Sequence, residues 1–202
     1  MIHRVVSVEK LNRTFNTVRE ELREVGLLEE GRYLDRIRCY RAWLPTLQGF
    51  SGYVYDETVP WLNRIVGFVP GDIYIPLNAQ VRPSTPGETL LDTVRHEFGH
   101  SWAWLDREHI DGRWFRRVFG ACYGDEWESE PDFDRSEFVS AYACTRPAED
   151  FCETLMTFLR CRRSLHRFDR RPGLKRKLSA VAGAVSIAAR TRVPSVRGPR
   201  RR

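Results

Sequence analysis

The chain has 202 residues, of which 42% are hydrophobic, 12% aromatic and 30% charged. This length allows one compact domain with an extension, and the apolar content excludes global disorder. No stretch reaches the roughly 18 to 20 apolar residues of a membrane-spanning helix, and the N-terminus lacks a secretory signal pattern. Five cysteines without a C-x-x-C pair argue against a disulfide scaffold and for reduced thiols. We therefore expect a cytoplasmic protein.

The net charge of +6 conceals two oppositely charged parts of the chain. Residues 160–202 contain 15 basic residues and a single acid, whereas residues 1–159 carry more acids than bases. We expect the basic segment to be solvated; weak binding to nucleic acid or another anionic surface is the alternative interpretation. The acidic stretch at 125–137 lacks the spacing of a calcium-binding loop, so we expect a solvated loop there.

These observations predict one domain over residues 1–163, with a helical N-terminal part at 1–70. Residues 164–202 then form a basic extension of that domain. Within the extension, the alanine-rich stretch 174–189 is expected to be helical. The end beyond it, which is rich in arginine and poor in apolar residues, is expected to be disordered.

In the first half of the chain, apolar residues spaced three and four apart predict a helix over residues 8–25. A similar, shorter pattern predicts a second helix over residues 34–44, which ends before a proline. A loop or short hairpin follows. Residues 72–77 alternate in the manner of a strand, and Pro76 predicts that it is an edge strand, because proline cannot donate a hydrogen bond to a neighbouring strand.

Two further helices are predicted in the second half of the chain. Thr85 can cap a helix that has Pro86 at its first position and that continues to about residue 106. Thr145 can cap a second helix, largely buried, over residues 147–162.

The first of these helices contains the sequence His96-Glu97-Phe98-Gly99-His100, an H-E-x-x-H pattern. Residues four apart project from one face of a helix, so both imidazoles can bind the same Zn²⁺. The carboxylate of Glu97 can then reach a water molecule at the metal, which is the position that a general base for hydrolysis must occupy. The motif predicts a catalytic zinc site.

A catalytic zinc ion needs a third protein ligand from elsewhere in the chain. Glu149 and Glu153 are four residues apart on the later helix, whose other residues are mostly apolar. An unpaired carboxylate would be costly in that setting. We expect one of the two glutamates to bind the metal and the other to accept a hydrogen bond from the outer nitrogen of a ligating histidine.

Together these segments resemble gluzincin metallopeptidases. The segment Pro147-x-Glu149-Asp150-Phe151-x-Glu153 is similar to the P-x-E-D-F/W-x-E segment of bacterial zinc-binding metallopeptidases, and the likeness extends more distantly to lethal-factor and MtfA-type catalytic domains. The resemblance covers about sixty residues. It implies a zincin-like α+β domain, mostly helical, with a small sheet that carries an edge strand at the active site.

The resemblance also implies a role for each residue of the site. It implies that Zn²⁺ is bound by His96, His100 and Glu149. Glu97 is then the general base and Glu153 the partner of a ligating histidine. The relatives have a tyrosine seven positions before the glutamate ligand, and its hydroxyl supports the transition state; here that position is Tyr142.

We therefore expect a zinc metallopeptidase that hydrolyses peptide bonds in a protein or peptide substrate. One alternative is a protease that its basic extension anchors to nucleic acid. Another is a binding module in which zinc is only structural. Cys144 and Cys152 could approach the metal as inhibitory thiolates, although a cysteine among apolar helix residues is usually a small buried hydrophobic residue.

Overall fold

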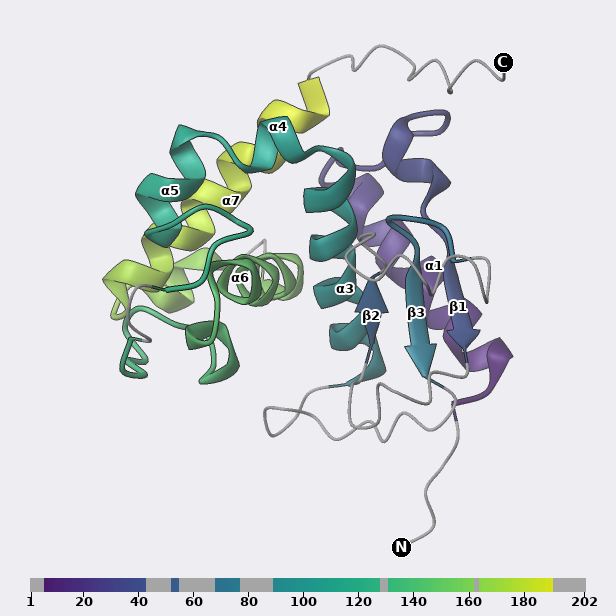
Figure 1. Ribbon diagram of the computed structural model, residues 1–202, viewed down its shortest axis with the longest axis horizontal. Helices are drawn as coiled ribbons and strands as arrows, with labels where there is room; N and C mark the ends of the chain where they lie inside the picture. The colour runs from purple at the N-terminus through teal and green to yellow at the C-terminus, as the bar shows by residue number, and fades with distance from the viewer. Residues whose placement is uncertain are drawn as a thin grey trace, which may run out of the picture.

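The computed structural model describes residues 6–42, 52–54, 68–76, 89–127, 131–161 and 164–190 (Figure 1). Its α-helices are α1 (Val8–Glu24), α3 (Leu90–Leu105), α4 (Arg107–Ile110), α5 (Arg113–Phe119), α6 (Pro147–Cys161) and α7 (Pro172–Arg190). Short 3₁₀ helices are η1 (Tyr33–Arg36), η2 (Tyr142–Cys144) and η3 (Leu165–Phe168). The strands are β1 (Cys39–Ala42), β2 (Tyr53–Val54) and β3 (Ile73–Pro76).

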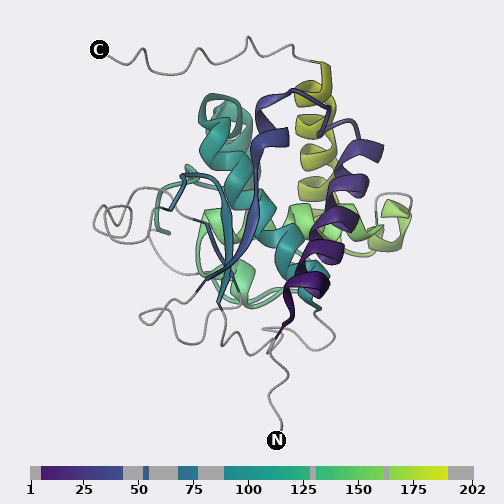
Figure 2. The ribbon, with the colours of Figure 1, turned by 90° about the vertical axis from the view of Figure 1, so that its right-hand side faces the viewer.

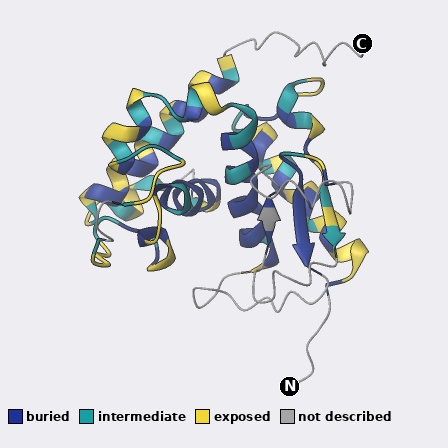
Figure 3. Ribbon diagram, in the orientation of Figure 1, coloured by how far each residue is buried: buried dark blue, intermediate teal, exposed yellow. Residues whose placement is uncertain are grey.

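The described residues form a mostly helical α+β structure with α3 at its centre. In Figure 1, α3 stands between the small sheet on one side and α5, α6 and α7 on the other. It packs against α6, α1, β2 and β3. Figure 3 shows that α3 and α6 are buried along most of their length. The H-E-x-x-H helix is therefore surrounded by other elements rather than lying on the surface.

The sheet has three strands in the order β1-β3-β2. Strand β3 is parallel to β1 and antiparallel to β2. The prediction that residues 72–77 form an edge strand is therefore wrong, since β3 is the central strand. Pro76 is tolerated because it is the last residue of β3, and β2 pairs only with Ile73 and Tyr74. The edge nearest α3 is formed by β2.

Two predicted helices differ from the structure. Residues 34–44 do not form one helix, because η1 ends at Arg36 and β1 begins at Cys39. Helix α3 begins at Leu90, not after Thr85, and it is capped by Thr89. The Thr89 side chain accepts from the backbone N–H of Asp92, while the Asp92 carboxylate accepts from the backbone N–H of Thr89. Thr85 itself lies outside the described residues.

The predictions of α1, α6 and the alanine-rich helix are confirmed to within a few residues. Helix α7 does more than extend the chain. It packs against α5 and α6, and Leu174, Leu178, Val181 and Val185 lie in the main hydrophobic core. A division at residue 163 between a domain and a tail therefore does not describe how residues 172–190 pack. Residues 191–202, which were expected to be disordered, lie outside the described part.

Among the helices of the described residues, none is both long enough and apolar enough to cross a membrane.

Candidate metal centre

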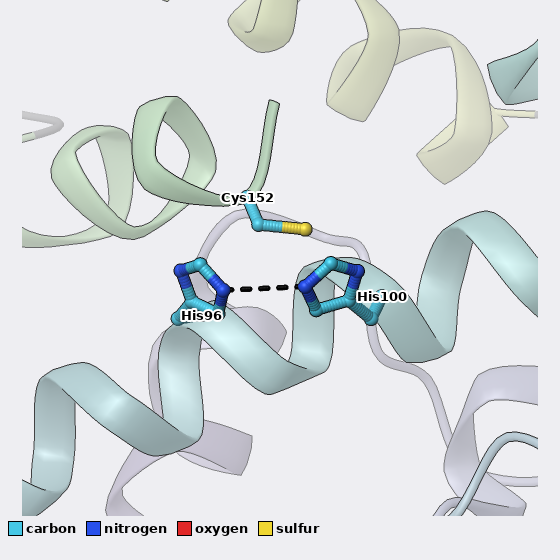
Figure 4. Close-up of side chains that lie close together, drawn as sticks. All are labelled: His96, His100 and Cys152. Atoms are coloured by element: carbon cyan, nitrogen blue, oxygen red, sulfur yellow. Dashed lines mark hydrogen bonds between the residues drawn. The ribbon is translucent and has the colours of Figure 1, made fainter. Parts of the chain in front are cut away.

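His96 and His100 lie one helical turn apart on α3, and their side chains face α6. Figure 4 shows both rings on the same side of the helix, with Cys152 of α6 across from them. The two Nε2 atoms are 3.2 Å apart. The helix itself is anchored by Arg95, whose guanidinium binds Glu21 of α1 and Asp92 of its own first turn. These contacts join the N-terminal half of α3 to α1.

Glu149 of α6 completes a triangle of possible ligand atoms. Its Oε2 atom lies 3.1 Å from Nε2 of His96 and 3.4 Å from Nε2 of His100. In tetrahedral coordination, bonds of about 2.0–2.1 Å to zinc place neighbouring nitrogen and oxygen ligands about 3.3–3.4 Å apart. The three observed separations are close to that value, so these atoms fit a tetrahedral Zn²⁺ site.

At the triangle, the two Nε2 atoms lie within hydrogen-bond distance of each other, and Oε2 of Glu149 lies beside both. Nδ1 of His96 lies 2.8 Å from Oε1 of Glu153, and because a carboxylate only accepts, the Nδ1 atom donates. Nε2 of the neutral imidazole then carries a lone pair. Oε2 of Glu149 is buried, and no hydrogen bond to it has acceptable geometry within the described part of the chain. Lone pairs this close repel one another unless a cation or a proton lies between them.

The pKa values of His96 and Glu149 are both shifted in the direction that favours positive charge at the triangle. Burial lowers the pKa of His96, but the hydrogen bonds and charges of the surrounding carboxylates, Glu149 and Glu153 first, raise it well above its usual range. Burial raises the pKa of Glu149, but the charges of His100 and His96 hold it well below its usual range. Both shifts favour positive charge at the triangle, and a divalent cation would compete with protons for these atoms.

Glu97 points to the opposite, sheet side of the centre. Its side chain is buried, and the backbone of Gly52, next to β2, lies against the carboxylate. Burial raises the pKa of Glu97, although the charges of His96 and His100 oppose this rise. A raised pKa makes the carboxylate a stronger base, which suits a general base.

The sequence-predicted Tyr142 and Glu153 both lie at the centre. The Tyr142 ring centroid is 5.9 Å from that of His96, and the residue is 38% exposed, so its hydroxyl can meet a molecule that enters from solvent. Burial and the charge of Glu149 raise the pKa of Tyr142, which keeps the hydroxyl protonated and able to donate. Glu153 is fully buried, and its Oε2 accepts from Oγ of Ser140 at 2.8 Å.

Two further residues lie at the centre. Tyr123 was not predicted from the sequence, and Cys152 was expected to be a buried hydrophobic residue. Tyr123 places its hydroxyl 2.6 Å from Nδ1 of His100, the position that Glu153 occupies at Nδ1 of His96. The sequence contained only an indirect indication of Tyr123. Each histidine that binds a metal needs a hydrogen-bond partner for its outer nitrogen, and the sequence suggested such a partner for only one of the two histidines. Cys152 is buried as expected, yet its Sγ lies within 4.8 Å of ligand nitrogens of His96 and His100.

Comparison with known proteins agrees with this chemistry. Residues 78–174 match the family model described as "Putative zinc-binding metallo-peptidase". The matched segment contains both histidines and the later helix α6 with Glu149. No curated protein and no solved structure matches the chain significantly. The family match supports the assignment of this chain to a zinc metallopeptidase family.

Proposed function

We propose that the chain is a zinc-dependent peptidase of the gluzincin type with a zincin-like fold. The observation that carries the proposal is the triangle formed by Nε2 of His96, Nε2 of His100 and Oε2 of Glu149, with edges of 3.1 to 3.4 Å. These two histidines and one glutamate leave a fourth tetrahedral position free for water or substrate, whereas structural zinc sites have four protein ligands. The donor set therefore supports a catalytic role.

Each of the surrounding side chains would have a separate role in hydrolysis. Zn²⁺ bound at the triangle supplies Lewis-acid chemistry, which polarises a carbonyl and lowers the pKa of water. Glu97 takes the proton of the attacking water and returns it to the leaving amine. The hydroxyl of Tyr142 donates to the oxyanion that develops on the carbonyl oxygen. Glu153, held by Ser140, keeps His96 in the tautomer that presents Nε2.

We further propose that a peptide substrate binds in extended form beside β2. This two-residue strand is the sheet edge nearest α3, and the preceding Gly52 contacts Glu97. An open strand edge offers N–H and C=O groups at the spacing that a peptide backbone requires. The scissile bond would then lie between the sheet and the metal.

The proposal is tested by measuring zinc content and peptide cleavage on the same protein samples. We expect Glu97→Gln to retain one zinc ion and lose turnover, because it alters the base and not a ligand. His96→Ala and Glu149→Gln should lose zinc. Cys152→Ala should retain both zinc and activity, since its sulfur is not needed to complete the triangle. His166→Ala, at an exposed histidine of η3, is the matched control.

Three results would contradict the proposal. An active Glu97→Gln protein would exclude Glu97 as the base. Loss of zinc in Cys152→Ala with retention in Glu149→Gln would assign the third ligand to the cysteine. A zinc-loaded wild-type protein that cleaves no member of a broad peptide library would leave a binding module as the better interpretation.

A further inference from the structure

A groove lies between α1 and β1, at the sheet edge opposite β2. Figure 2 shows these two elements next to each other on the face turned toward the viewer. Its cavity volume is about 470 Å³, within the range of about 300–1,000 Å³ that is usual for ligand sites. The lining residues are Val8, Leu11, Asn12, Phe15, Asn16 and Arg19 of α1, together with Arg38 and Cys39–Arg41.

The walls of this groove are basic. Three arginines line it, and none of the described lining residues is acidic. Arg19 pairs with Asp35, which lies outside the lining. The Arg38 guanidinium donates to the backbone oxygens of Asp35 and Ile37, and its charge also acts on the nearby carboxylate of Asp72, which lies outside the lining. The Nε atom of Arg41 is buried and has no hydrogen-bond partner in the described part of the chain. A buried donor of this kind is costly unless a ligand accepts from it.

Among the described strands, β1 is an edge strand whose outer side pairs with no other strand. The backbone oxygen of Arg38, just before β1, accepts from N–H of Ile73, and Tyr40 is paired with Tyr74, so these residues face β3. In a parallel ladder, alternate residues direct their N–H and C=O groups to opposite sides. The backbone groups of Cys39 and Arg41 therefore point away from β3, and both residues line the groove.

We propose that this groove binds an acidic peptide segment of another protein in extended conformation. The peptide backbone pairs with β1 at Cys39 and Arg41, and peptide carboxylates accept from the guanidinium groups of Arg41 and Arg38. The amides of Asn12 and Asn16, one turn apart on α1, offer further hydrogen bonds from the other wall. Because β3 separates β1 from β2, the peptide would bind at the opposite sheet edge from the proposed substrate, so this binding does not depend on peptide hydrolysis.

The test uses the zinc-loaded, full-length Glu97→Gln protein, so that a bound peptide is not cleaved. A fluorescein-labelled peptide of alternating Glu and Val is titrated, and binding is followed by fluorescence anisotropy. We expect saturable binding that weakens as salt rises from 50 to 200 mM. A peptide with Lys in place of Glu should not bind. A peptide of alternating Glu and Pro, which keeps the charge but lacks every second backbone N–H donor, should bind much more weakly.

Matched variants locate the site. Arg41→Gln should weaken binding about tenfold, as expected for a lost charge-assisted hydrogen bond. Asn16 is exposed on α1, so Asn16→Asp should weaken and Asn16→Lys should strengthen binding without affecting folding. Arg113→Gln, at an exposed arginine of α5, is the control. Circular dichroism melts check that each variant is folded.

Equal affinity of the wild-type groove and the two Asn16 variants would overturn the proposal, even if Arg41→Gln fails to fold. Equal binding of the Glu–Val and Glu–Pro peptides would overturn strand pairing at β1. A protein that binds the acidic peptide but cleaves nothing would keep this inference and refute the peptidase, whereas the reverse result would refute only this inference.

Discussion

Gly52 lies so close to Glu97 that a side chain at residue 52 would collide with the carboxylate. A Cβ atom built on Gly52 would stand 2.6 Å from both Cγ and Oε1 of Glu97, well inside the 3.5–4.0 Å of a favourable carbon contact. Glu97 is only 7% exposed, so its carboxylate cannot simply swing into solvent. The glycine thus allows the edge of the sheet to cover the proposed base.

The first prediction follows from this contact. Gly52→Ala should displace the Glu97 carboxylate by about an ångström and lower kcat about a hundredfold, because reacting groups must be held at close and oriented distances. Zinc should stay bound, since Gly52 contacts no atom of the ligand triangle among its nearest neighbours. Peptide cleavage and zinc content are measured on the same sample.

Two controls separate the collision from a general effect of adding a methyl group. Gly183 on α7 has nothing within 4 Å of its added Cβ, so Gly183→Ala should keep full activity. Aspartate at 97 is shorter by one methylene and leaves room for alanine. Gly52→Ala should therefore cost much less activity in a Glu97→Asp background, and strictly additive losses would show that the two residues do not interact.

A second prediction concerns Tyr142, whose ring lies beside that of His96. Tyr142→Phe removes one hydroxyl and no ligand, so zinc content should be unchanged while kcat falls ten- to a thousandfold, as for other lost oxyanion donors. Because the donor acts in the transition state, KM should change little. Unchanged kcat would remove Tyr142 from the mechanism.

Residues related by local spacing could be predicted from the sequence. His96 and His100 are four residues apart on one helix, and so are Glu149 and Glu153, so the periodicity of a helix is enough to place each pair on one face. The structure brings the two pairs together through the packing of α3 on α6. The sequence could only suggest that these two pairs lie close together. It did not show which glutamate faces the two Nε2 atoms, and only the family resemblance indicated Glu149.

Relationships between distant residues could not be predicted. Residues 39–42 have the apolar spacing of a helix but form β1, because pairing with β3 satisfies their backbone groups. No local pattern in residues 39–42 predicts that they pair with β3. The edge prediction for β3 failed for the same reason, since proline at a strand end leaves both sides of the strand open to pairing.

A third prediction concerns the partners of the two histidines. Tyr123→Phe removes the only oxygen bonded to Nδ1 of His100 in the described part of the chain, and zinc affinity should fall about ten- to a hundredfold. Glu153→Gln should have a similar effect through His96. Affinity is measured by competition with a chromophoric chelator. Tyr33→Phe, which removes a hydroxyl bonded to Asp106 away from the centre, is the control and should leave zinc affinity unchanged.

The last prediction concerns the buried ion pair that joins α7 to α6. Lys177 Nζ lies 2.7 Å from Oδ2 of Asp150 and also donates to the backbone oxygen of Glu137. Burial raises the pKa of Asp150 to about 6 even beside this lysine. Lys177→Met leaves the carboxyl buried without its partner, so the free energy of unfolding should fall by about 3–5 kcal/mol.

The urea-unfolding midpoint of Lys177→Met measures this loss. The control is Lys175→Met, which breaks an exposed pair with Asp169 and should cost about 1 kcal/mol or less. Replacing both partners, as in Asp150→Leu with Lys177→Met, should recover much of the stability, because no charge then remains unpaired. Equal midpoints for the two single lysine variants would mean that α7 is not held to α6 by this pair. In that case the orientation of α6 that turns Glu149 toward the histidines would rest on its apolar packing and on the contacts of Glu153 with His96 and Ser140.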